Sequence, residues 1–287
     1  MNNKILVIGG TGTIGSLVIE ELQKKNANYV ALVRSEEKAE ALEAKGVPTV
    51  IGSVGEQGSI EHVFEGIDTV FLLTSPSNDM LELHKEVIDI AVKSGVRKIV
   101  RQSGEPAGYS EPTGLYILHN QADEYLKKSG LEHVILRPHY FMQNMFMHAD
   151  YIKSQGMFAQ YLGETKIPMI DARDIAKAAF NALTTDKFND QTFVLTGPRA
   201  ISFYDIAKTM SSTIGRDINY VSLSYEDQRE GFKSFGLPDW SVDSVMAVFK
   251  TWVDMGMMEP TNDLETITNS KGVDIDEFAK DHAPVFA

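Results

Sequence analysis

A glycine-rich segment directly after the first apolar run constrains the fold of this chain more than any other feature. The segment VIGGTGTIGSLVIEEL places Gly9, Gly12 and Gly15 three residues apart, after an expected strand and at the start of an amphipathic helix. Glycines permit a tight turn and the close approach of a diphosphate, and a helix N-terminus supplies amide donors. A mere strand-to-helix turn is the alternative, but it needs one glycine rather than three plus Gly10. The segment therefore predicts a dinucleotide-binding βαβ unit.

The residue that follows the second expected strand distinguishes between the two nicotinamide cofactors. NAD-binding proteins usually carry Asp or Glu there, whereas a basic residue suits the 2′-phosphate of NADP. In ALVRSEEK this residue is Arg34, whose guanidinium fork matches a phosphate in two-point contact. The alternative is a solvated arginine paired with Glu36 or Glu37. We expect NADP(H) as the cofactor, with NADPH preferred over NADH.

The hydrophobic pattern predicts an α/β fold. Short apolar runs alternate with amphipathic segments, as in a parallel sheet covered by helices, until the pattern loosens after about residue 150. We expect a Rossmann-type doubly wound parallel sheet at 1–150 and a small interleaved C-terminal α/β lobe at 151–287, where Ser202 is the expected N-cap of a helix. In the first part we expect strands at 4–9, 29–33, 48–52, 68–73, 97–102 and 133–138, and helices at 13–26, 36–45, 56–65, 80–94 and 116–129.

Charge and residue content argue against several functional classes. The 287 residues carry a formal net charge of −13 and no Cys. A surface for nucleic acid would have to work against this field, and disulfides and thiolate chemistry are excluded. Nowhere do 18 apolar residues run together, and neither His139 nor His148 has metal-ligand spacing with a carboxylate. We expect a soluble cytoplasmic protein, a monomer or homodimer, that binds a small molecule but no metal, membrane or nucleic acid.

The segment TGLYILHNQADEY at 113–125 departs from the usual catalytic pattern of nicotinamide-dependent reductases. Many of them place a lysine four residues after a helical tyrosine, but the fourth residue after Tyr116 is Asn120. Asparagine carries no charge and cannot lower the pKa of a phenol. His119 can share a helix face with Tyr116, and an imidazole could donate a proton or hold the nicotinamide ribose. The alternative is an ordinary surface or capping histidine.

The chain resembles the NmrA-like group of atypical short-chain dehydrogenases over nearly its whole length. The resemblance rests on GGTGTIG (9–15), LVRSEEKAEAL (32–42), HNQADEYLKKSGLEHVILRPHYFMQN (119–144), IPMIDARDIAKAA (167–179) and ITNSKGVDIDEFAKDHAPVF (267–286). The group includes flavin-free NAD(P)H:quinone oxidoreductases, azo-dye and triphenylmethane-dye reductases, and redox-sensing regulators. The resemblance therefore implies NADP(H) without flavin. Relatives commonly carry Asp beside the adenine where this chain has Ser53, which weakens that contact.

The resemblance also implies which residues contact the cofactor. Phosphate contacts are implied at Gly9, Thr11, Gly12, Thr13 and Ile14, with the 2′-phosphate at Arg34. The nicotinamide side is implied to be formed by Thr74, Ser75, Pro76, Ser103, His119, Pro138, Tyr140 and Phe141. His119 falls where related plant reductases carry a helix lysine.

The segment HYFMQNMFMHADYI at 139–152 predicts an apolar substrate site. It follows the sixth expected strand, where ligands bind in this architecture, and Met and aromatic side chains tolerate flat substrates of varied outline. The expected substrate contacts are Tyr140, Phe141, Met142, Met145 and, from the resemblance alone, Trp240. The alternative is that a Met and Phe stripe at helical spacing belongs to the core.

Our leading hypothesis is an NADPH-dependent oxidoreductase that reduces a quinone or a similar conjugated acceptor, with Ser103, His119 and Tyr140 as catalytic candidates. Such acceptors delocalise the incoming charge, so a strong enzymic acid is less necessary. Two other functions stay open. One is an NADP(H)-binding sensor that acts through a protein partner, and the other is a nucleotide-sugar epimerase or dehydratase, which needs the missing tyrosine–lysine pair.

Overall fold

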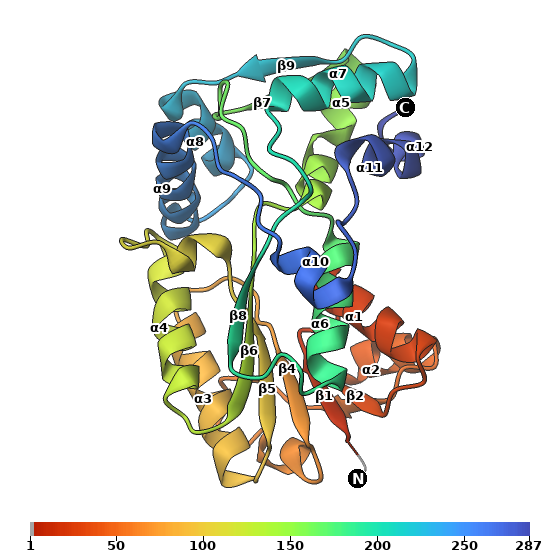
Figure 1. The fold of residues 1–287 in the computed structure, drawn as a ribbon, viewed down its shortest axis with the longest axis vertical. Helices are drawn as coiled ribbons and strands as arrows, with labels where there is room; N and C mark the ends of the chain where they lie inside the picture. Colours follow the sequence, from red (N-terminus) through yellow and green to blue (C-terminus); the bar gives the residue numbers. More distant parts are fainter. Residues whose placement is uncertain (1–2) are drawn as a thin grey trace. The chain divides into compact units, whose positions relative to one another are not determined.

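The computed structural model describes residues 3–287 and divides the chain into two compact units (Figure 1). Unit 1 comprises the chain up to Pro112, Tyr116–Arg137 and Ile175–Val194, and unit 2 comprises Thr113–Leu115, Pro138–Asp174 and Leu195–Ala287. We expected a Rossmann core at 1–150 and a smaller lobe at 151–287 interleaved with it. In the structure a long segment of unit 2 begins at Pro138, and the chain returns to unit 1 at Ile175.

The core of the fold is a 7-stranded sheet with the strand order β3-β2-β1-β4-β5-β6-β8, and every neighbouring pair from β3 to β6 is parallel. This order confirms the doubly wound α/β fold, whose ligand crevice lies beyond the carboxyl ends of β1 and β4. The strands are β1 (Ile5–Ile8), β2 (Tyr29–Val33), β3 (Thr49–Ile51), β4 (Thr69–Leu72), β5 (Lys98–Gln102), β6 (Glu132–Pro138) and β8 (Gln191–Leu195).

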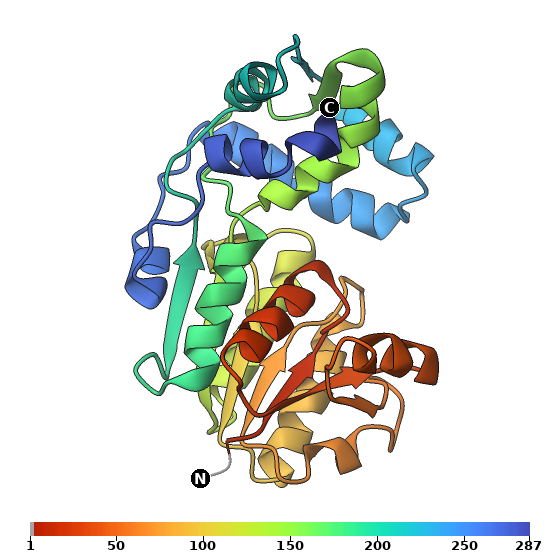
Figure 2. The same cartoon turned by 90° about the vertical axis from the view of Figure 1, so that its right-hand side faces the viewer.

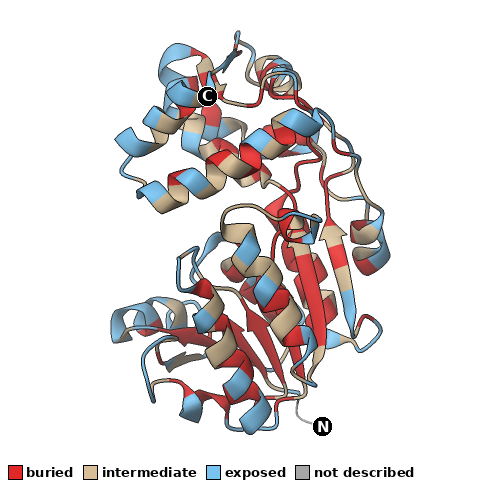
Figure 3. Cartoon of the chain, turned by 90° about the vertical axis from the view of Figure 1, so that its left-hand side faces the viewer, coloured by how far each residue is buried: buried red, intermediate tan, exposed pale blue. Residues whose placement is uncertain are grey.

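Helices cover both faces of this sheet, which explains why its strands read as nearly continuous apolar runs. In β1, β2, β4 and β5 every residue is buried, as the red strands of Figure 3 show. Within unit 1, α3 and α4 lie on one face and α1 and α6 on the other (Figures 1 and 2). The helices are α1 (Thr13–Lys24), α2 (Glu36–Glu43), α3 (Met80–Lys93), α4 (Leu115–Lys127) and α6 (Ala172–Thr184), with short 3-10 helices η1 (Glu61–Phe64) and η2 (Glu105–Gly108).

The helix expected at 56–65 is wrong. Only η1 forms there, because Gly55 and Gly58 have φ angles of +88° and +76°. A right-handed helix cannot include residues in that conformation.

Unit 2 contains a two-stranded parallel sheet of β7 (Met157–Gln160) and β9 (Asn219–Ser222) with helices around it. The expected cap is confirmed: Ser202 and Asp205 form a capping box at the start of α7. The remaining helices are η3 (Met142–His148), α5 (Ala149–Gln155), α7 (Phe203–Ile214), α8 (Tyr225–Ser234), α9 (Asp239–Met255), α10 (Asp263–Thr268), α11 (Ile275–Asp281) and α12 (Ala283–Phe286).

Candidate active site

The glycine loop connects β1 to α1 with a geometry that only glycine allows. Gly9 has a φ of +87°, and a Cβ on it would lie 2.4 Å from the carbonyl oxygen of Leu73, at the end of β4. A Cβ on Gly15 would lie 2.1 Å from the carbonyl oxygen of Gly9. The loop is therefore held between β4 and α1, at the point where the strand order reverses.

The outer side of the same loop is open and suits a diphosphate. Thr11, Gly12 and Thr13 are exposed, and a Cβ on Gly12 would meet only the Gly9 carbonyl oxygen, at 3.6 Å. The N-terminus of α1 has no side-chain cap and no acidic residue in its first turn. The first amides of α1, at Thr13 and Ile14, therefore have no side-chain acceptor, and the helix dipole favours an anion at this position.

Arg34 is an exposed, unpaired cation directly after β2. It is one residue before Ser35, which caps α2 by accepting from the amide of Lys38. Within residues 3–287 Arg34 makes no ion pair with Glu36 or Glu37, contrary to the alternative that we considered. Its guanidinium is thus available to a phosphate.

Polar side chains form a hydrogen-bonded cluster at the carboxyl ends of β5 and β6. Arg101 of β5 is fully buried and forms an ion pair with the equally buried Asp123 of α4. Asp123 also accepts hydrogen bonds from Nε and Nη2 of Arg137, at 3.0 and 2.8 Å, and from Oγ of Ser103, at 3.0 Å. We call Arg101, Asp123, Arg137 and Ser103 the ionic cluster. The Ser103 hydroxyl thus donates its hydrogen to Asp123, and the catalytic role of Ser103 stays a prediction.

Two histidines contact the ionic cluster through Arg101. Its Nε donates to Nδ1 of His84 in α3 at 2.9 Å, and its Nη2 lies 3.1 Å from Nδ1 of His119 in α4. Burial and the nearby charge of Arg101 hold the pKa of each imidazole well below its ordinary value. Both rings are therefore neutral at pH 7, and His119 is suited to donate a hydrogen bond rather than to act as a cationic acid.

The residues around His119 explain the departure from the usual tyrosine–lysine pattern. The Tyr116 ring stacks on His119 with centroids 5.4 Å apart, and burial raises the pKa of Tyr116 to about 12. A Cβ on Gly104 would lie 2.2 Å from the Tyr116 ring. Asn120 donates to the carbonyl oxygen of Ala107 at 2.9 Å and so holds the η2 segment. Asn120 is thus a structural residue, and the phenol of Tyr116 is not activated.

Glu105, in η2, is a titratable group that the sequence did not single out. Burial raises the pKa of its carboxyl to about 7, although it accepts a hydrogen bond from the Tyr109 hydroxyl at 2.8 Å. The charge of Arg137 opposes this shift. The segment GEPAG therefore carries a carboxyl that titrates near neutral pH.

The segment after β4 contributes Thr74, Ser75 and Pro76. Ser75 and Pro76 are exposed, whereas Thr74 is half-buried, with its Oγ1 2.9 Å from Nε2 of His84. The amide of Ser53, after β3, donates a hydrogen bond to the Ser59 hydroxyl oxygen at 2.9 Å. Its expected weak role beside the adenine stays a prediction.

The residues expected to contact substrate belong to unit 2. Tyr140 is half-buried among the rings of Phe203, Phe249 and Trp252, with centroids 6.3, 6.0 and 5.9 Å away, and its hydroxyl accepts from Gln160 at 3.4 Å. We call these three rings with Tyr140 the aromatic cluster. Trp252 was not among the expected site residues, because it lies within an apolar helix face that also suits a core.

The other expected contacts divide between core and surface. Met142 and Met145 are 1% and 0% exposed and pack in the core of unit 2, and their substrate roles stay predictions. Pro138 is also buried, whereas Phe141 and Trp240 are half-buried. The substrate roles of Phe141 and Trp240 stay predictions.

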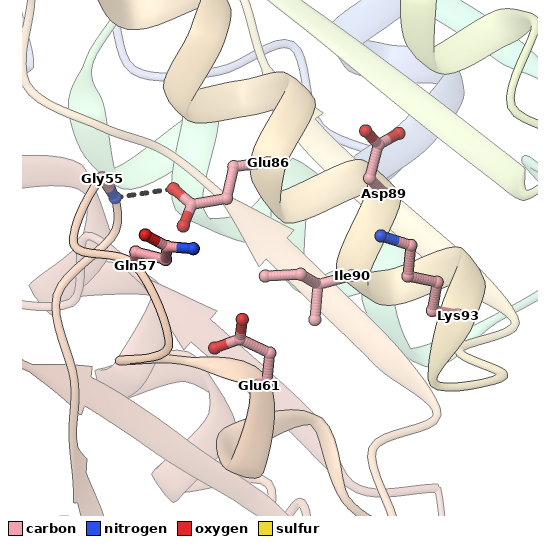
Figure 4. Close-up of a pocket in the computed structure, with 7 residues that line it drawn as sticks. All are labelled: Gly55, Gln57, Glu61, Glu86, Asp89, Ile90 and Lys93. Carbon is pink, nitrogen blue, oxygen red and sulfur yellow. Dashed lines mark hydrogen bonds between the residues drawn. The ribbon is translucent and has the colours of Figure 1, made fainter.

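A separate pocket of about 310 Å³ opens on unit 1 beside α3 (Figure 4). Its lining includes the carboxylates of Glu61, Glu86 and Asp89 and a single cation, Lys93. The amide of Gly55 donates to Glu86 at 2.6 Å. This acidic lining disfavours a phosphate, so the glycine loop rather than this pocket suits a dinucleotide.

Membrane-spanning helices and clusters of metal ligands are both absent from residues 3–287. No helix in this part of the chain is long and apolar enough to span a membrane. No group of three or more His, Asp or Glu side chains there is arranged to hold a metal ion.

Comparisons with known proteins agree with this geometry. The chain is 34% identical over 284 residues to the NAD(P)H azoreductase of Xenophilus azovorans, covering 98% of this chain and 99% of that protein. It is 29% identical to quinone oxidoreductase 2 of Escherichia coli over 83% of this chain and 84% of that protein.

A solved structure supports the same assignment. The Escherichia coli NADPH-dependent quinone oxidoreductase in complex with NADPH matches with a TM-score of 0.87 at 26% identity, over 96% of this chain and 99% of that one. The model of the NmrA-like family matches residues 1–285. The chain therefore belongs to the NmrA-like family.

Proposed function

We propose that this chain is an NAD(P)H-dependent oxidoreductase that prefers NADPH and transfers hydride to a quinone or a similar conjugated acceptor, such as an azo compound. The observation that carries the proposal is the open glycine loop with an uncapped helix N-terminus, followed one strand later by the unpaired Arg34. The names of the azoreductase and quinone oxidoreductase relatives support the choice of acceptor.

Different residues hold different parts of the cofactor. The amides at the start of α1 bind the diphosphate, and Arg34 binds the 2′-phosphate in two-point contact. Thr74, after β4, and His119, in α4, lie on the elements that follow the strand-order reversal and contact the nicotinamide half. No flavin is part of this proposal.

The chemistry that the bound cofactor supplies is hydride donation. The neutral His119 contributes a hydrogen bond and no strong acid, because its pKa lies well below the ordinary value. Likewise, the high pKa of Tyr116 makes the phenol a weak acid. An acceptor that spreads the incoming charge over its own π-system does not require a stronger acid.

The test is NADPH consumption, followed by absorbance, with a panel of quinones, azo dyes and simple aldehydes. We expect turnover of at least one conjugated acceptor and a loss of roughly 10-fold or more in His119→Ala, because a positioned donor is removed. Exposed His62 in η1 provides the matched control, His62→Ala. Tight NADP binding without turnover across the panel would refute the enzyme and favour a sensor.

The cofactor preference has its own test. Arg34→Ala should reduce the preference for NADPH over NADH by roughly 10-fold or more, because a charge-assisted contact to the 2′-phosphate is lost. Lys45→Ala removes the same charge from an exposed position after α2 and should leave the preference unchanged. An unchanged preference in Arg34→Ala would refute the role given to this residue.

A further inference from the structure

Arg101 donates hydrogen bonds to two histidines at once. Its Nε lies 2.9 Å from Nδ1 of His84, and its Nη2 lies 3.1 Å from Nδ1 of His119, while Nη1 pairs with Asp123. A guanidinium has five N–H donors and no acceptor. Nδ1 of each imidazole must therefore be the acceptor in these contacts and cannot carry a proton.

This requirement determines the tautomer of both rings. A neutral imidazole carries one N–H, so with Nδ1 unprotonated the hydrogen is on Nε2. A second proton on either ring would point an N–H at the guanidinium. Burial and the charge of Arg101 keep the pKa of both rings low, which agrees with single protonation at pH 7.

The tautomer of His84 determines the direction of its hydrogen bond with Thr74. Nε2 of His84 lies 2.9 Å from Oγ1 of Thr74, so this N–H donates and the hydroxyl accepts. The hydrogen of the Thr74 hydroxyl is then free to donate, because this hydroxyl makes no second hydrogen bond within residues 3–287. Nε2 of His119 likewise has no partner in that part of the chain.

We propose that Arg101 is a positioning residue that sets His84 and His119 as Nε2–H tautomers and so makes the Thr74 hydroxyl and the His119 imidazole hydrogen-bond donors to a bound ligand. A carbonyl oxygen, which occurs in the nicotinamide carboxamide and in a quinone, is the ligand group that accepts from such donors. This inference rests on the proposed function for the identity of the ligand, but not for the tautomers.

Long-range 1H–15N NMR of histidine-labelled, ligand-free protein tests the tautomers without any turnover. The chain has seven histidines, and spectra of His84→Gln and His119→Gln assign the two signals. We expect both rings to show an unprotonated Nδ1 and a protonated Nε2 at pH 7. A protonated Nδ1, or averaging between tautomers, in either ring would overturn the proposal. Because this measurement uses the unaltered ring environment, it decides even if variants of Arg101 do not fold.

The role of Arg101 is tested by Arg101→Lys, with Arg137→Lys as the matched control. Arg137 donates to Asp123 but to neither histidine, so its variant should keep both tautomers. We expect Arg101→Lys to show tautomer averaging at His119. Fixed Nε2–H tautomers in Arg101→Lys, or loss of them in Arg137→Lys, would contradict the role of Arg101.

Binding and kinetics then identify the ligand that receives the two donors. If they contact the cofactor, Arg101→Lys weakens NADP+ binding in calorimetry by roughly 10-fold; if they contact the acceptor, the KM for a quinone rises by a similar factor with NADP+ binding unchanged. Unchanged NADP+ binding and unchanged quinone KM in a folded Arg101→Lys protein would overturn the donor role. Absence of turnover together with weakened NADP+ binding would refute the proposed function and retain this inference.

Discussion

The ionic cluster of unit 1 and the aromatic cluster of unit 2 surround their candidate residues with opposite chemistry. Behind His119, Arg101 and Asp123 are both fully buried charges that depend on each other. Around Tyr140 the neighbours are rings with centroids about 6 Å away, such as Phe249 at 6.0 Å. Buried charges orient donors strictly, and the loss of one charge leaves its partner unpaired, whereas the loss of one ring opens a cavity but leaves no charge unpaired.

The largest expected effect is the loss of Asp123. Asp123→Leu leaves Arg101 buried without its counter-ion and should lower the free energy of unfolding by about 3–5 kcal/mol. The double variant Arg101→Met/Asp123→Leu removes both fully buried charges, leaves only the half-buried Arg137 without its partner, and should recover part of this loss in urea denaturation. If the two single losses simply add, the cluster is not coupled and the comparison between the units fails.

For a single substitution in the aromatic cluster we expect a similar loss of unfolding free energy, but a second substitution should not restore it. Phe249→Ala opens a cavity and should cost about 3–5 kcal/mol of unfolding free energy. Phe232 contacts the Phe249 ring, with centroids 6.3 Å apart, so Phe249→Ala/Phe232→Ala should be less stable than either single variant. A double variant more stable than Phe249→Ala would show that this cluster behaves like the ionic one.

Glu105 gives a smaller effect that depends on pH. Burial raises its folded pKa from 4.5 to about 7, so the folded state binds the proton more tightly and the protein loses stability as pH rises from about 4.5 to 7. Glu105→Gln should therefore be more stable than wild type at pH 8, by on the order of 2 kcal/mol, and equal to it near pH 4. Glu111→Gln, at an exposed site nearby, is the control and should show no such difference. Equal gains at pH 4 and pH 8 would contradict burial of an ionisable carboxyl.

The smallest effect is expected at Tyr140. Tyr140→Phe keeps the ring among Phe203, Phe249 and Trp252 and removes only the hydroxyl that accepts from Gln160 at 3.4 Å. The unfolding free energy should fall by about 1 kcal/mol or less in thermal or urea denaturation. A loss of several kcal/mol would mean that unit 2 also depends on a polar network.

The sequence predicts the sheet and the glycine loop well because both follow from local patterns. The apolar runs of β1 to β6 and the spacing of Gly9, Gly12 and Gly15 are each read within one segment. The ionic cluster was missed because its members come from β5, α4 and β6, and their pairing depends on tertiary packing. One signal was present: Arg101 stands inside an expected strand of the sheet, directly after Ile99 and Val100, and a buried charge requires a partner.

The residues after β6 show what a hydrophobic pattern in the sequence cannot distinguish. The Met and Phe stripe fits either a substrate wall or a core, and only burial shows that Met142 and Met145 belong to the core. The exchange of the chain between the two units is also hard to locate from the sequence. α6 has an apolar face whatever it packs against, and its return to unit 1 leaves no mark in the local sequence.

The order of segments in the two units has a consequence for how the protein can be cut and evolve. The chain passes from one unit to the other after Pro112, Leu115, Arg137, Asp174 and Val194. No single cut of the chain therefore separates a complete unit 1 from a complete unit 2. A recombination event with one crossover would join parts of two proteins within at least one of the units.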